Sequence, residues 1–352
     1  MRNKRIFFYH TEDSHYIIRS WERGCFPGHF LYGATHFAEN GIDMAIRKHR
    51  DFPCRFLMML DTARQVFMCK GPIDGIFATR YEGLEIIIML RALGLYRKRI
   101  VVWHHQPIVT SGKRWKEWIG KIFYKGIDQM FFFSEKILEE SAATGKTRRD
   151  KMHLGHWGPD LRFYDKVIRE TKEVDKPIFI STGRERRDMK TLVEAFNQTG
   201  RQLYIYTTKG NCGNDYESLL GGMEIKENVH ISFTGGYQQN TLCYEVAKAS
   251  CAVVCCLETN YTCGLTSIVE AMALGKPVIC SRNIRMPFDA EKEGFGITVG
   301  YNDVDGWKKA IEYISTHPKE SAEMGRKGRK LVEERFNDYI CSREISDILL
   351  SE

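Results

Sequence analysis

The second half of the sequence alternates short apolar runs with segments of helical periodicity. This alternation is typical of a parallel β-sheet covered by helices. Residues 251–257 are almost all apolar, which predicts a strand buried on both faces of the sheet. The expected strands span 177–181, 202–207, 229–233, 251–257, 277–280 and 296–299, and the expected helices span 189–197, 241–249, 268–274 and 304–315.

The first half repeats this pattern less regularly, so we expect a second α/β domain of similar size. Its expected strands span 5–9, 99–103 and 129–133, and its expected helices span 30–39, 83–95 and 113–127. A length of 352 residues suits two domains. The Gly158-Pro159-Asp160 turn and the charged segment 165–176 predict a linker between them.

The composition is that of an ordinary folded protein. Hydrophobic residues make up 43% of the chain and aromatic residues 12%, which excludes a disordered protein. The apolar stretch 84–90 is interrupted by Glu85, and the apolar run 6–9 is too short for a signal peptide, so we expect neither a membrane span nor a leader. The 11 cysteines include no C-x-x-C pair, which predicts reduced core residues and a cytoplasmic location.

Positive charge is concentrated in the first half of the chain. The whole chain has a net charge of +7, and residues 1–165 hold 27 Lys and Arg against 18 Asp and Glu. A basic domain favours an anionic partner such as a membrane surface, a nucleic acid or a phosphorylated substrate. We expect no nucleic-acid partner, because no recognition motif for one is present. A G-x-G-x-x-G motif is missing from the first helix of either half, which disfavours a dinucleotide oxidoreductase.

The most informative segment runs from Glu258 to Val278. It follows a buried strand, turns at Gly264 and enters a predicted helix near Ser267. The exposed N–H groups and the positive dipole end of such a helix suit a diphosphate. Gly264 allows close approach of the backbone, and the hydroxyls of Thr266 and Ser267 are suited to capping or hydrogen bonding.

Glu270, in the same predicted helix, has two interpretations. As a binding residue it would accept hydrogen bonds from ribose hydroxyls. The spacing Ser267-x-x-Glu270 is also that of a capping box, in which the carboxylate only satisfies an N–H group at the start of the helix. The spacing by itself does not choose between ligand binding and capping.

This segment resembles the donor-nucleotide signature of retaining GT-B glycosyltransferases, in particular glycosyltransferase family four, also described as glycosyl transferases group 1. The matching residues are Gly264-Leu265, Glu270-Ala271-Met272-Ala273, Gly275 and Pro277-Val278. Four further segments agree with the family in order along the chain. They are 131–135 with 151–164, 181–184 with 191–196, 234–237, and 244–250.

The resemblance implies an α/β fold of GT-B architecture, in which two Rossmann-like domains have parallel sheets facing a central cleft. The implied domains are residues 1–163 for the acceptor, residues 164–335 for the nucleotide sugar, and a C-terminal helix within 336–352 that returns to the first domain. The implied activity is transfer of a hexose from a nucleotide diphosphate sugar to a glycan or lipid-linked acceptor. The expected pathway is the synthesis of a surface polysaccharide or glycolipid, and no cofactor is expected.

The expected donor-binding residues follow from this resemblance. Members of the family usually carry two glutamates with seven residues between them, and Thr262 occupies the first of these positions. The contact with the donor sugar is therefore expected from Glu258, Asn260 or Thr262. The remaining expected donor contacts are Gly28, Gly183, Arg184, Arg187, Lys190, Tyr237, Gly264, Leu265, Thr266, Ser267 and Glu270.

The basic cluster behind the strand 177–181 contains the expected cations for the diphosphate. Fixed cations stabilise the charge that develops on a pyrophosphate leaving group. Arg184 matches the arginine of the family, and either Arg187 or Lys190 matches its lysine; we favour Arg187. A lone basic cluster is a weak motif, and a solvated charge at a helix terminus is the alternative for each residue.

Two histidines end the strand 99–103, which is where open α/β sheets bind ligands. His105 aligns with a histidine that lies near the donor sugar in the family, whereas we expect His104 to lie in the core. The resemblance therefore implies catalytic roles for His105, Glu270 and Arg184. Gly28 resembles the glycine loop that faces the diphosphate.

We predict no metal site. Asp303-Val304-Asp305 has the D-x-D form, but it precedes a predicted helix and is better explained as a helix cap. His153 and His156 lack a third ligand at a suitable spacing.

The segment 113–127 predicts an amphipathic helix that is rich in basic and aromatic residues. Its sequence favours peripheral association with an anionic membrane, at the inner face of the cytoplasmic membrane. The alternative is that its apolar face packs against the core of its own domain. The residues expected to contact the membrane or the acceptor are Lys113, Arg114, Trp115, Trp118 and Lys121.

The second hypothesis is a catalytically silent subunit that binds a nucleotide sugar, which Thr262 motivates. The sequence leaves open the base and sugar of the donor, the acceptor, the linkage and the oligomeric state.

Overall fold

The computed structural model describes residues 3–172, 178–211, 213–235 and 239–351. The chain forms two compact units, of which the first comprises Met1–Trp157 with Asp338–Glu352 and the second comprises Gly158–Asn337. Each unit contains a six-stranded sheet within its described residues. All strand pairs within these two sheets are parallel, so the α/β expectation is confirmed.

The elements of the first unit follow one another as strands and helices in alternation. They are β1 (Lys4–Tyr9), α1 (Ser14–Glu22), the 3-10 helices η1 (Gly28–Leu31) and η2 (Ala34–His36), β2 (Ile42–Ile46), α2 (Arg55–Phe67), β3 (Gly75–Ala78), α3 (Glu85–Ala92), β4 (Arg99–His104), α4 (Arg114–Lys125), β5 (Gln129–Phe132), α5 (Glu135–Ala142), η3 (Arg149–Lys151), β6 (Met152–Leu154) and α13 (Asp338–Leu350).

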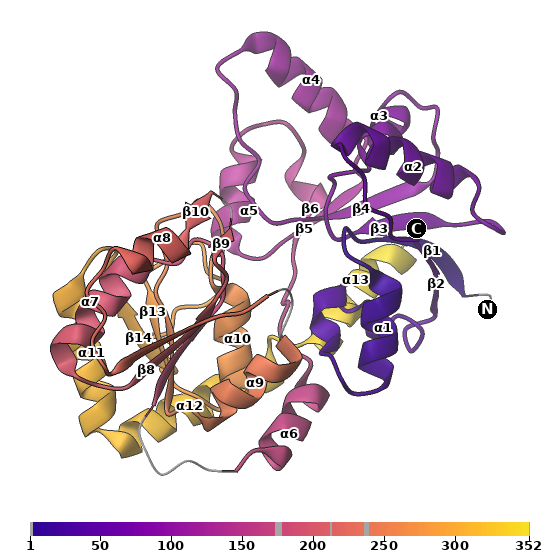
Figure 1. Cartoon of the computed structure of the whole chain (residues 1–352). Helices are drawn as coiled ribbons and strands as arrows, with labels where there is room; N and C mark the ends of the chain where they lie inside the picture. Colours follow the sequence, from indigo (N-terminus) through magenta and orange to yellow (C-terminus); the bar gives the residue numbers. More distant parts are fainter. Residues whose placement is uncertain (1–2, 173–177, 212, 236–238, 352) are drawn as a thin grey trace. The chain divides into compact units, whose positions relative to one another are not determined.

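The sheet of the first unit has the strand order β2-β1-β3-β4-β5-β6. Successive side chains of a strand point to opposite faces, and both faces are covered here. Phe7 and Tyr9 belong to the core formed with α2, α3 and α5, whereas Phe8 packs on Phe77, which in turn packs on Phe37 beside η2. Because both faces are covered, the central strands β3 and β4 (Figure 1) are buried at every position except Arg99, and both are mainly apolar.

The last helix, α13, belongs to the first unit although it lies at the other end of the chain. The His36 Nε2 atom lies 3.1 Å from an Asp338 carboxylate oxygen. A Cβ atom on Gly33 would lie 2.6 Å from the Cα atom of Ser342, so the glycine allows the helix to approach closely. Cys341 of α13 is fully buried.

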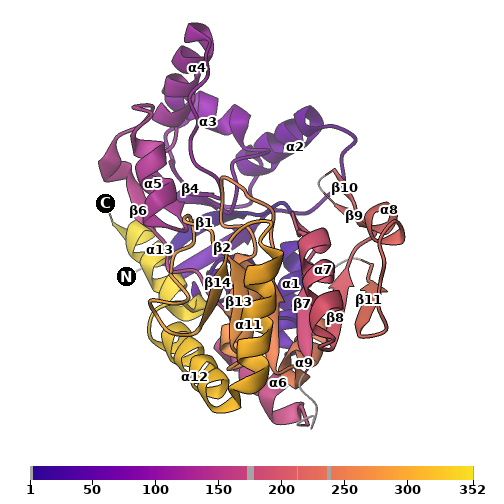
Figure 2. The ribbon, with the colours of Figure 1, turned by 90° about the vertical axis from the view of Figure 1, so that its left-hand side faces the viewer.

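The second unit has the strand order β11-β8-β7-β12-β13-β14 (Figure 2). Its elements are α6 (Leu161–Glu170), β7 (Phe179–Thr182), α7 (Met189–Thr199), β8 (Leu203–Thr207), β9 (Gly210–Asn211), β10 (Asn214–Asp215), α8 (Tyr216–Gly221), β11 (Val229–Phe233), α9 (Gln239–Lys248), β12 (Cys251–Val254), α10 (Leu265–Ala273), β13 (Val278–Ser281), β14 (Gly296–Val299), α11 (Val304–Thr316) and α12 (Pro318–Glu334).

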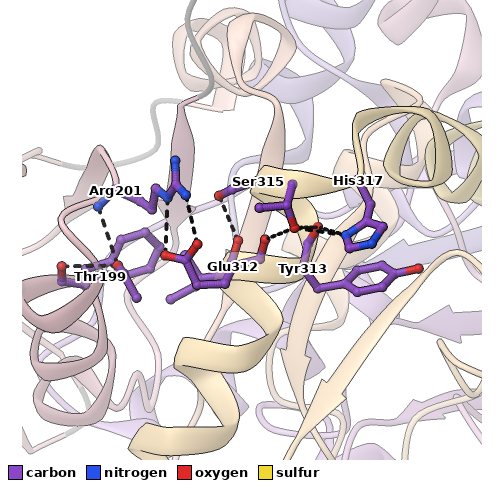
Figure 3. A network of polar contacts seen from close by, with 9 residues as sticks. Thr199, Arg201, Glu312, Tyr313, Ser315 and His317 are labelled. Atoms are coloured by element: carbon purple, nitrogen blue, oxygen red, sulfur yellow. Dashed lines mark hydrogen bonds and ion pairs between the residues drawn. The ribbon is translucent and has the colours of Figure 1, made fainter.

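Two buried clusters cover the faces of this sheet. One contains residues of α6, α9, α10 and α12, and the other contains residues of α7, α8 and α11. On the second face, Arg201 pairs with Glu312 at 2.8 Å and so joins the end of α7 to α11 (Figure 3). Thr199, at the end of α7, accepts a hydrogen bond from the backbone N–H of Arg201.

Two expectations about the first half of the chain are wrong. The helix expected at 30–39 is two short 3-10 helices, because Gly33 between them has a left-handed conformation with φ of 76°. The Gly158-Pro159-Asp160 turn lies where the second unit begins, as expected, but the charged segment expected as a linker begins within α6. The first turn of α6 is capped by the Asp160 carboxylate through a 3.1 Å hydrogen bond from the N–H of Phe163. Residues 173–177 lie outside the described residues.

Candidate functional site

The turn between β12 and α10 forms the centre of the candidate site in the second unit. Gly264 precedes α10 in a left-handed conformation with φ of 91°. A Cβ atom there would lie 2.7 Å from a methyl carbon of Val254, so only glycine fits without rearrangement. The helix begins at Leu265, two residues before the expected start near Ser267.

The capping-box interpretation of Glu270 is wrong. Ser267 is the third residue of α10, and the helix has no side-chain cap. The Ser267 hydroxyl instead donates a 3.2 Å hydrogen bond to the carbonyl of Thr182 and accepts one of 3.1 Å from Arg187. It therefore connects the start of α10 to the end of β7.

Glu270 lies on α10 and faces Tyr164 of α6. Burial raises the pKa of the Glu270 carboxyl to about 7, while a hydrogen bond with Tyr164 and the charge of Arg187 act in the opposite direction. Burial also raises the pKa of the Tyr164 hydroxyl, so that this group stays protonated. A carboxyl with such a pKa is present in both its protonated and its ionised form near neutral pH, as a donor and as an acceptor of hydrogen bonds. The sequence pattern gave no indication that Tyr164 is a partner of Glu270.

Arg187 is buried, with 5% of its surface exposed. Its guanidinium donates hydrogen bonds to the carbonyls of Thr182, at 3.2 Å, and Glu185, at 2.9 Å. Gly183 has φ of 113°, and a Cβ atom there would collide with the guanidinium. Arg187 therefore holds the loop after β7 against the start of α10.

Two cysteines that were predicted only as core residues, Cys256 and Cys263, also contact Arg187. Its Nη1 atom lies 3.3 Å from the sulfur of Cys256 and 3.8 Å from that of Cys263. A hydrogen bond with Cys263 lowers the pKa of the Cys256 thiol to about 7; burial opposes this shift, and the charge of Arg187 supports it. The pKa of Cys263 is raised by the same hydrogen bond and by burial. Their spacing across the turn was the only sequence signal of this contact.

The other residues predicted to bind the donor surround this turn to different degrees. Thr262 is buried, and its carbonyl accepts a 3.1 Å hydrogen bond from the N–H of Leu265, which is also buried. Thr266 and Arg184 are partly exposed. Glu258 and Lys190 are exposed. Tyr237 lies outside the described residues.

His105 follows β4 in the first unit. Its Nε2 atom lies 2.8 Å from the carbonyl oxygen of Thr79, so we assign the proton to Nε2; the Tyr32 hydroxyl lies 3.2 Å from the same nitrogen. Burial, together with the charge of Arg80, lowers the pKa of His105 to about 3. The imidazole is therefore neutral at physiological pH, and Nδ1 is its acceptor.

The two other residues of the first unit that the sequence singled out near the donor, His104 and Gly28, are buried. His104 is buried, as expected, and its ring stacks on Phe132 with a centroid distance of 5.4 Å. Gly28 is buried at the start of η1, and a Cβ atom there would lie 2.8 Å from Nε1 of Trp21. This contact gives Gly28 a packing role irrespective of any ligand.

Helix α4 is divided between a packed end and an exposed end. Phe123 and Tyr124, near its C-terminus, pack against the core. Trp115 and Trp118, near its N-terminus, are 59% and 66% exposed. The basic residues that flank them are exposed as well: Lys113, Arg114 and Lys121. The core-packing alternative therefore holds for the C-terminal end of the helix and not for the end with the tryptophans.

Asp303 caps α11 by accepting a 2.8 Å hydrogen bond from the N–H of Gly306, as predicted. No group of three or more His, Cys, Asp or Glu side chains that would suit a metal ion occurs in the described part of the chain. Within the same residues, no helix is both long enough and apolar enough to cross a membrane.

Comparison with known proteins relates this arrangement to one family. Residues 164–331 match the family model described as glycosyl transferases group 1. The resemblance to this family is confirmed. No curated protein sequence matches the chain.

Solved structures show the same fold over the whole chain. A glycosyltransferase from Rickettsia africae is 14% identical, with a TM-score of 0.71 and complete coverage of both chains. Sucrose-phosphate synthase from Thermosynechococcus elongatus is 19% identical, with a TM-score of 0.71 over 98% of each chain. HepE from Anabaena, solved with UDP and glucose, is 14% identical, with a TM-score of 0.68 over 99% of this chain and 100% of HepE. The fold is the GT-B fold of these glycosyltransferases.

Proposed function

We propose that this protein is a retaining glycosyltransferase that moves a hexose from a nucleotide diphosphate sugar to a hydroxyl of a glycan or lipid-linked acceptor. The observation that carries the proposal is the open N-terminus of α10, which Gly264 starts and beside which Arg187 is buried. A helix N-terminus next to a fixed cation is suited to a diphosphate. The match of this unit to the group 1 glycosyltransferases supports the same ligand.

The proposed donor is a UDP-sugar. HepE has been solved with UDP and with UDP-glucose, and these complexes have the fold of this chain. Glu270 would hold the ribose through its carboxyl group. Arg184 and Lys190 would contact the diphosphate from the partly exposed side, and Arg187 would act from the interior.

We propose attack on the same face of the sugar from which the nucleotide leaves. Neutral His105 is an acceptor at Nδ1, which suits a hydrogen bond from a hydroxyl of the sugar or of the acceptor. The cations and the helix end stabilise the leaving diphosphate, which can then take the proton of the incoming hydroxyl. This arrangement would neutralise the diphosphate without a metal ion.

The test combines nucleotide binding and transfer. Calorimetry with UDP is expected to show binding by the wild type and at least ~10-fold weaker binding by Glu270→Ala, since a lost hydrogen bond to a charged group costs about 1.5–3 kcal/mol. Glu194→Ala, which changes an exposed glutamate of α7, is the matched control. Unchanged UDP affinity in Glu270→Ala would refute the ribose assignment. If the protein neither hydrolyses nor transfers sugar from any member of a panel of nucleotide sugars, the proposed glycosyltransferase activity is refuted.

The second candidate is a catalytically silent nucleotide-sugar-binding subunit. The observation that favours it is that Thr262, at the position of the first family glutamate, is buried. This candidate predicts UDP binding without transfer until a partner chain is added. Transfer by the isolated chain would exclude it.

We also propose that the N-terminal end of α4 associates with an anionic membrane, at its cytoplasmic face. Exposed tryptophans flanked by lysine and arginine are suited to the lipid headgroup region. In flotation assays with vesicles that contain phosphatidylserine, the double variant Trp115→Ala, Trp118→Ala is expected to lose binding. Tyr16→Ala, which removes an equally exposed aromatic residue of α1, should keep it. Retained binding by the double variant would refute the helix as the anchor.

A further inference from the structure

The ends of β1, β2 and β3 in the first unit bring two arginines to one edge of the sheet. Arg47 follows β2 and Arg80 follows β3, and β1, which His10 follows, lies between these strands. Because the strands are parallel, these residues leave the sheet at the same edge. Ligands of open α/β sheets bind at this edge.

Arg47 is a buried cation, with only 2% of its surface exposed. Its Nη1 atom donates a 3.3 Å hydrogen bond to the carbonyl of His10, and its guanidinium lies 5.2 Å from the ring centre of Tyr9. Its Nε and Nη2 atoms have no hydrogen-bond partner among the residues that the structure describes. Buried guanidinium groups are normally paired, because burial without a counter-charge is costly.

Arg80 adds a second positive charge close to the first. Its side chain is exposed. Burial, together with the charges of Arg80 and Arg47, lowers the pKa of His10 to about 4, so both guanidinium groups act on one imidazole. Neither arginine forms an ion pair with a carboxylate in the described ranges. The hydroxyl of Thr79, the residue before Arg80, is buried and also lacks a hydrogen-bond partner among them.

We propose that Arg80 and Arg47 form a binding site for a phosphate group of the acceptor. A phosphate dianion matches two guanidinium groups in charge and in hydrogen-bond geometry. Arg80 meets the anion at the surface. Arg47 supplies the uncompensated charge behind it, and a small displacement of the covering side chains exposes its Nε and Nη2 donors and the Thr79 hydroxyl. The assignment to the acceptor rests on the proposed function.

The experiment is calorimetry with glucose 6-phosphate, inorganic phosphate and glucose, each titrated into the full chain. We expect binding of the sugar phosphate and none of glucose. Arg80→Ala should weaken the binding at least ~10-fold, because a charge-assisted hydrogen bond is lost at an exposed position where folding is not at risk. Arg343→Ala, an exposed arginine of α13, should bind as the wild type does. Equal affinity in Arg80→Ala and Arg343→Ala would overturn the proposal.

A second variant tests Arg47 through stability. Arg47→Met removes a guanidinium whose Nε and Nη2 atoms have no partner among the described residues. Removal of the buried charge offsets the lost hydrogen bond to the His10 carbonyl, so the melting temperature in phosphate-free buffer should not fall, and its rise on addition of phosphate should disappear. A lower melting temperature in phosphate-free buffer, together with an unchanged increase on addition of phosphate, would show that Arg47 has only a structural role and would overturn its place in the site.

Two further arms identify the source of the phosphate and separate this proposal from the proposed function. In the first arm, the titration is repeated with short-chain phosphatidylinositol in place of glucose 6-phosphate. Binding of this lipid by the wild type, weakened in Arg80→Ala to the same extent, would assign the phosphate group to a lipid acceptor. Inorganic phosphate that binds as tightly as either compound indicates an adventitious ion only and overturns the acceptor assignment. UDP affinity should be unchanged in both arginine variants. If the wild type does not bind UDP, the proposed donor is wrong, whereas the result with the sugar phosphate is unaffected.

Discussion

Burial shifts the ionisable residues at the two candidate sites toward their neutral forms. It raises the pKa of Glu270 to about 7 and, with the charge of Arg80, lowers that of His105 to about 3. Both shifts follow from the cost of keeping a charge in a medium of low polarity. Arg187 differs because it stays charged and is satisfied by internal hydrogen bonds. The residues around the α10 turn therefore combine one permanent charge with one carboxyl that titrates near neutral pH.

Glu270 makes the folded protein less stable as the pH rises. Its carboxyl has an ordinary pKa of 4.5 when unfolded and about 7 when folded, so between these values the folded state binds more protons than the unfolded state. The stability contribution is therefore lost as the pH rises from 4.5 through 7. Glu270→Gln removes this loss and should be more stable than the wild type at pH 8 by roughly 2–3 kcal/mol, with a smaller difference at pH 5. Urea unfolding at both values tests this, and a pH-independent difference would contradict it.

Arg187 is expected to be essential for stability. Arg187→Met removes the buried hydrogen bonds of the guanidinium to the carbonyls of Thr182 and Glu185 and to the Ser267 hydroxyl, and we expect a loss of about 3–5 kcal/mol in the free energy of unfolding. Lys190→Met changes an exposed cation of the same cluster and should alter stability by no more than about 0.5 kcal/mol. Urea denaturation of both variants makes the comparison. Similar losses in the free energy of unfolding of the two variants would contradict the structural role assigned to the buried Arg187.

At the level of elements, the start of α10 and the two ends of α4 show how local packing prepares a surface for binding. The glycine before α10 lets the strand turn sharply into the helix, so that backbone N–H groups remain available. In α4, Phe123 and Tyr124 anchor one end to the core, which leaves the tryptophans at the other end exposed. One amphipathic stripe therefore serves packing and a surface at the same time.

The left-handed conformation of Gly264 leads to a prediction about this turn. Gly264→Ala combines a left-handed backbone with a Cβ contact of 2.7 Å to Val254, and we expect a loss of about 2–3 kcal/mol. Gly200→Ala, at the end of α7, has φ of 68° but no atom within 4 Å of the new Cβ, and should lose only about 1 kcal/mol. Thermal or urea unfolding of the pair separates contact from backbone strain. A larger loss in Gly200→Ala would contradict this interpretation.

At the level of the whole molecule, the first unit is built from two separate segments of the chain, one from each end. Residues at both ends of the chain meet where α13 packs beside η2, through the contacts of Gly33 with Ser342 and of His36 with Asp338. Burial by itself would lower the pKa of His36, but hydrogen bonds and charges from Asp338 and Glu39 raise it to about 9. A protonated His36 therefore contributes to the attachment of α13, together with the buried side chains of this helix.

This attachment should weaken in alkaline solution. The ordinary pKa of His36 is 6.5 and its folded value is about 9, so the stabilisation is complete below pH 6.5 and is lost as the pH rises through 9. We expect the wild type to lose about 2 kcal/mol more than His36→Gln between pH 6 and pH 9.5, allowing for partial exposure of the pair. Urea unfolding followed by tryptophan fluorescence measures both proteins. Parallel pH profiles would exclude the histidine as the cause.

Local patterns in the sequence determined much of this protein. The strands at 229–233 and 296–299 and the helix that starts at Val304 were predicted to the residue, because β-branched and aromatic residues favour strands and helix caps are local. The motif around Gly264 and Glu270 likewise predicted the family and the GT-B fold, since its residues are adjacent in the chain.

Only the tertiary structure decided features that join distant residues. The sequence did not predict the meeting of Glu270 with Tyr164, the internal hydrogen bonds of Arg187 or the unpaired guanidinium of Arg47, because burial depends on what packs above a residue. The same reason applies to α4, where one apolar stripe is buried at one end and exposed at the other. Spacing along the chain reports which residues share a face, and the fold determines what covers that face.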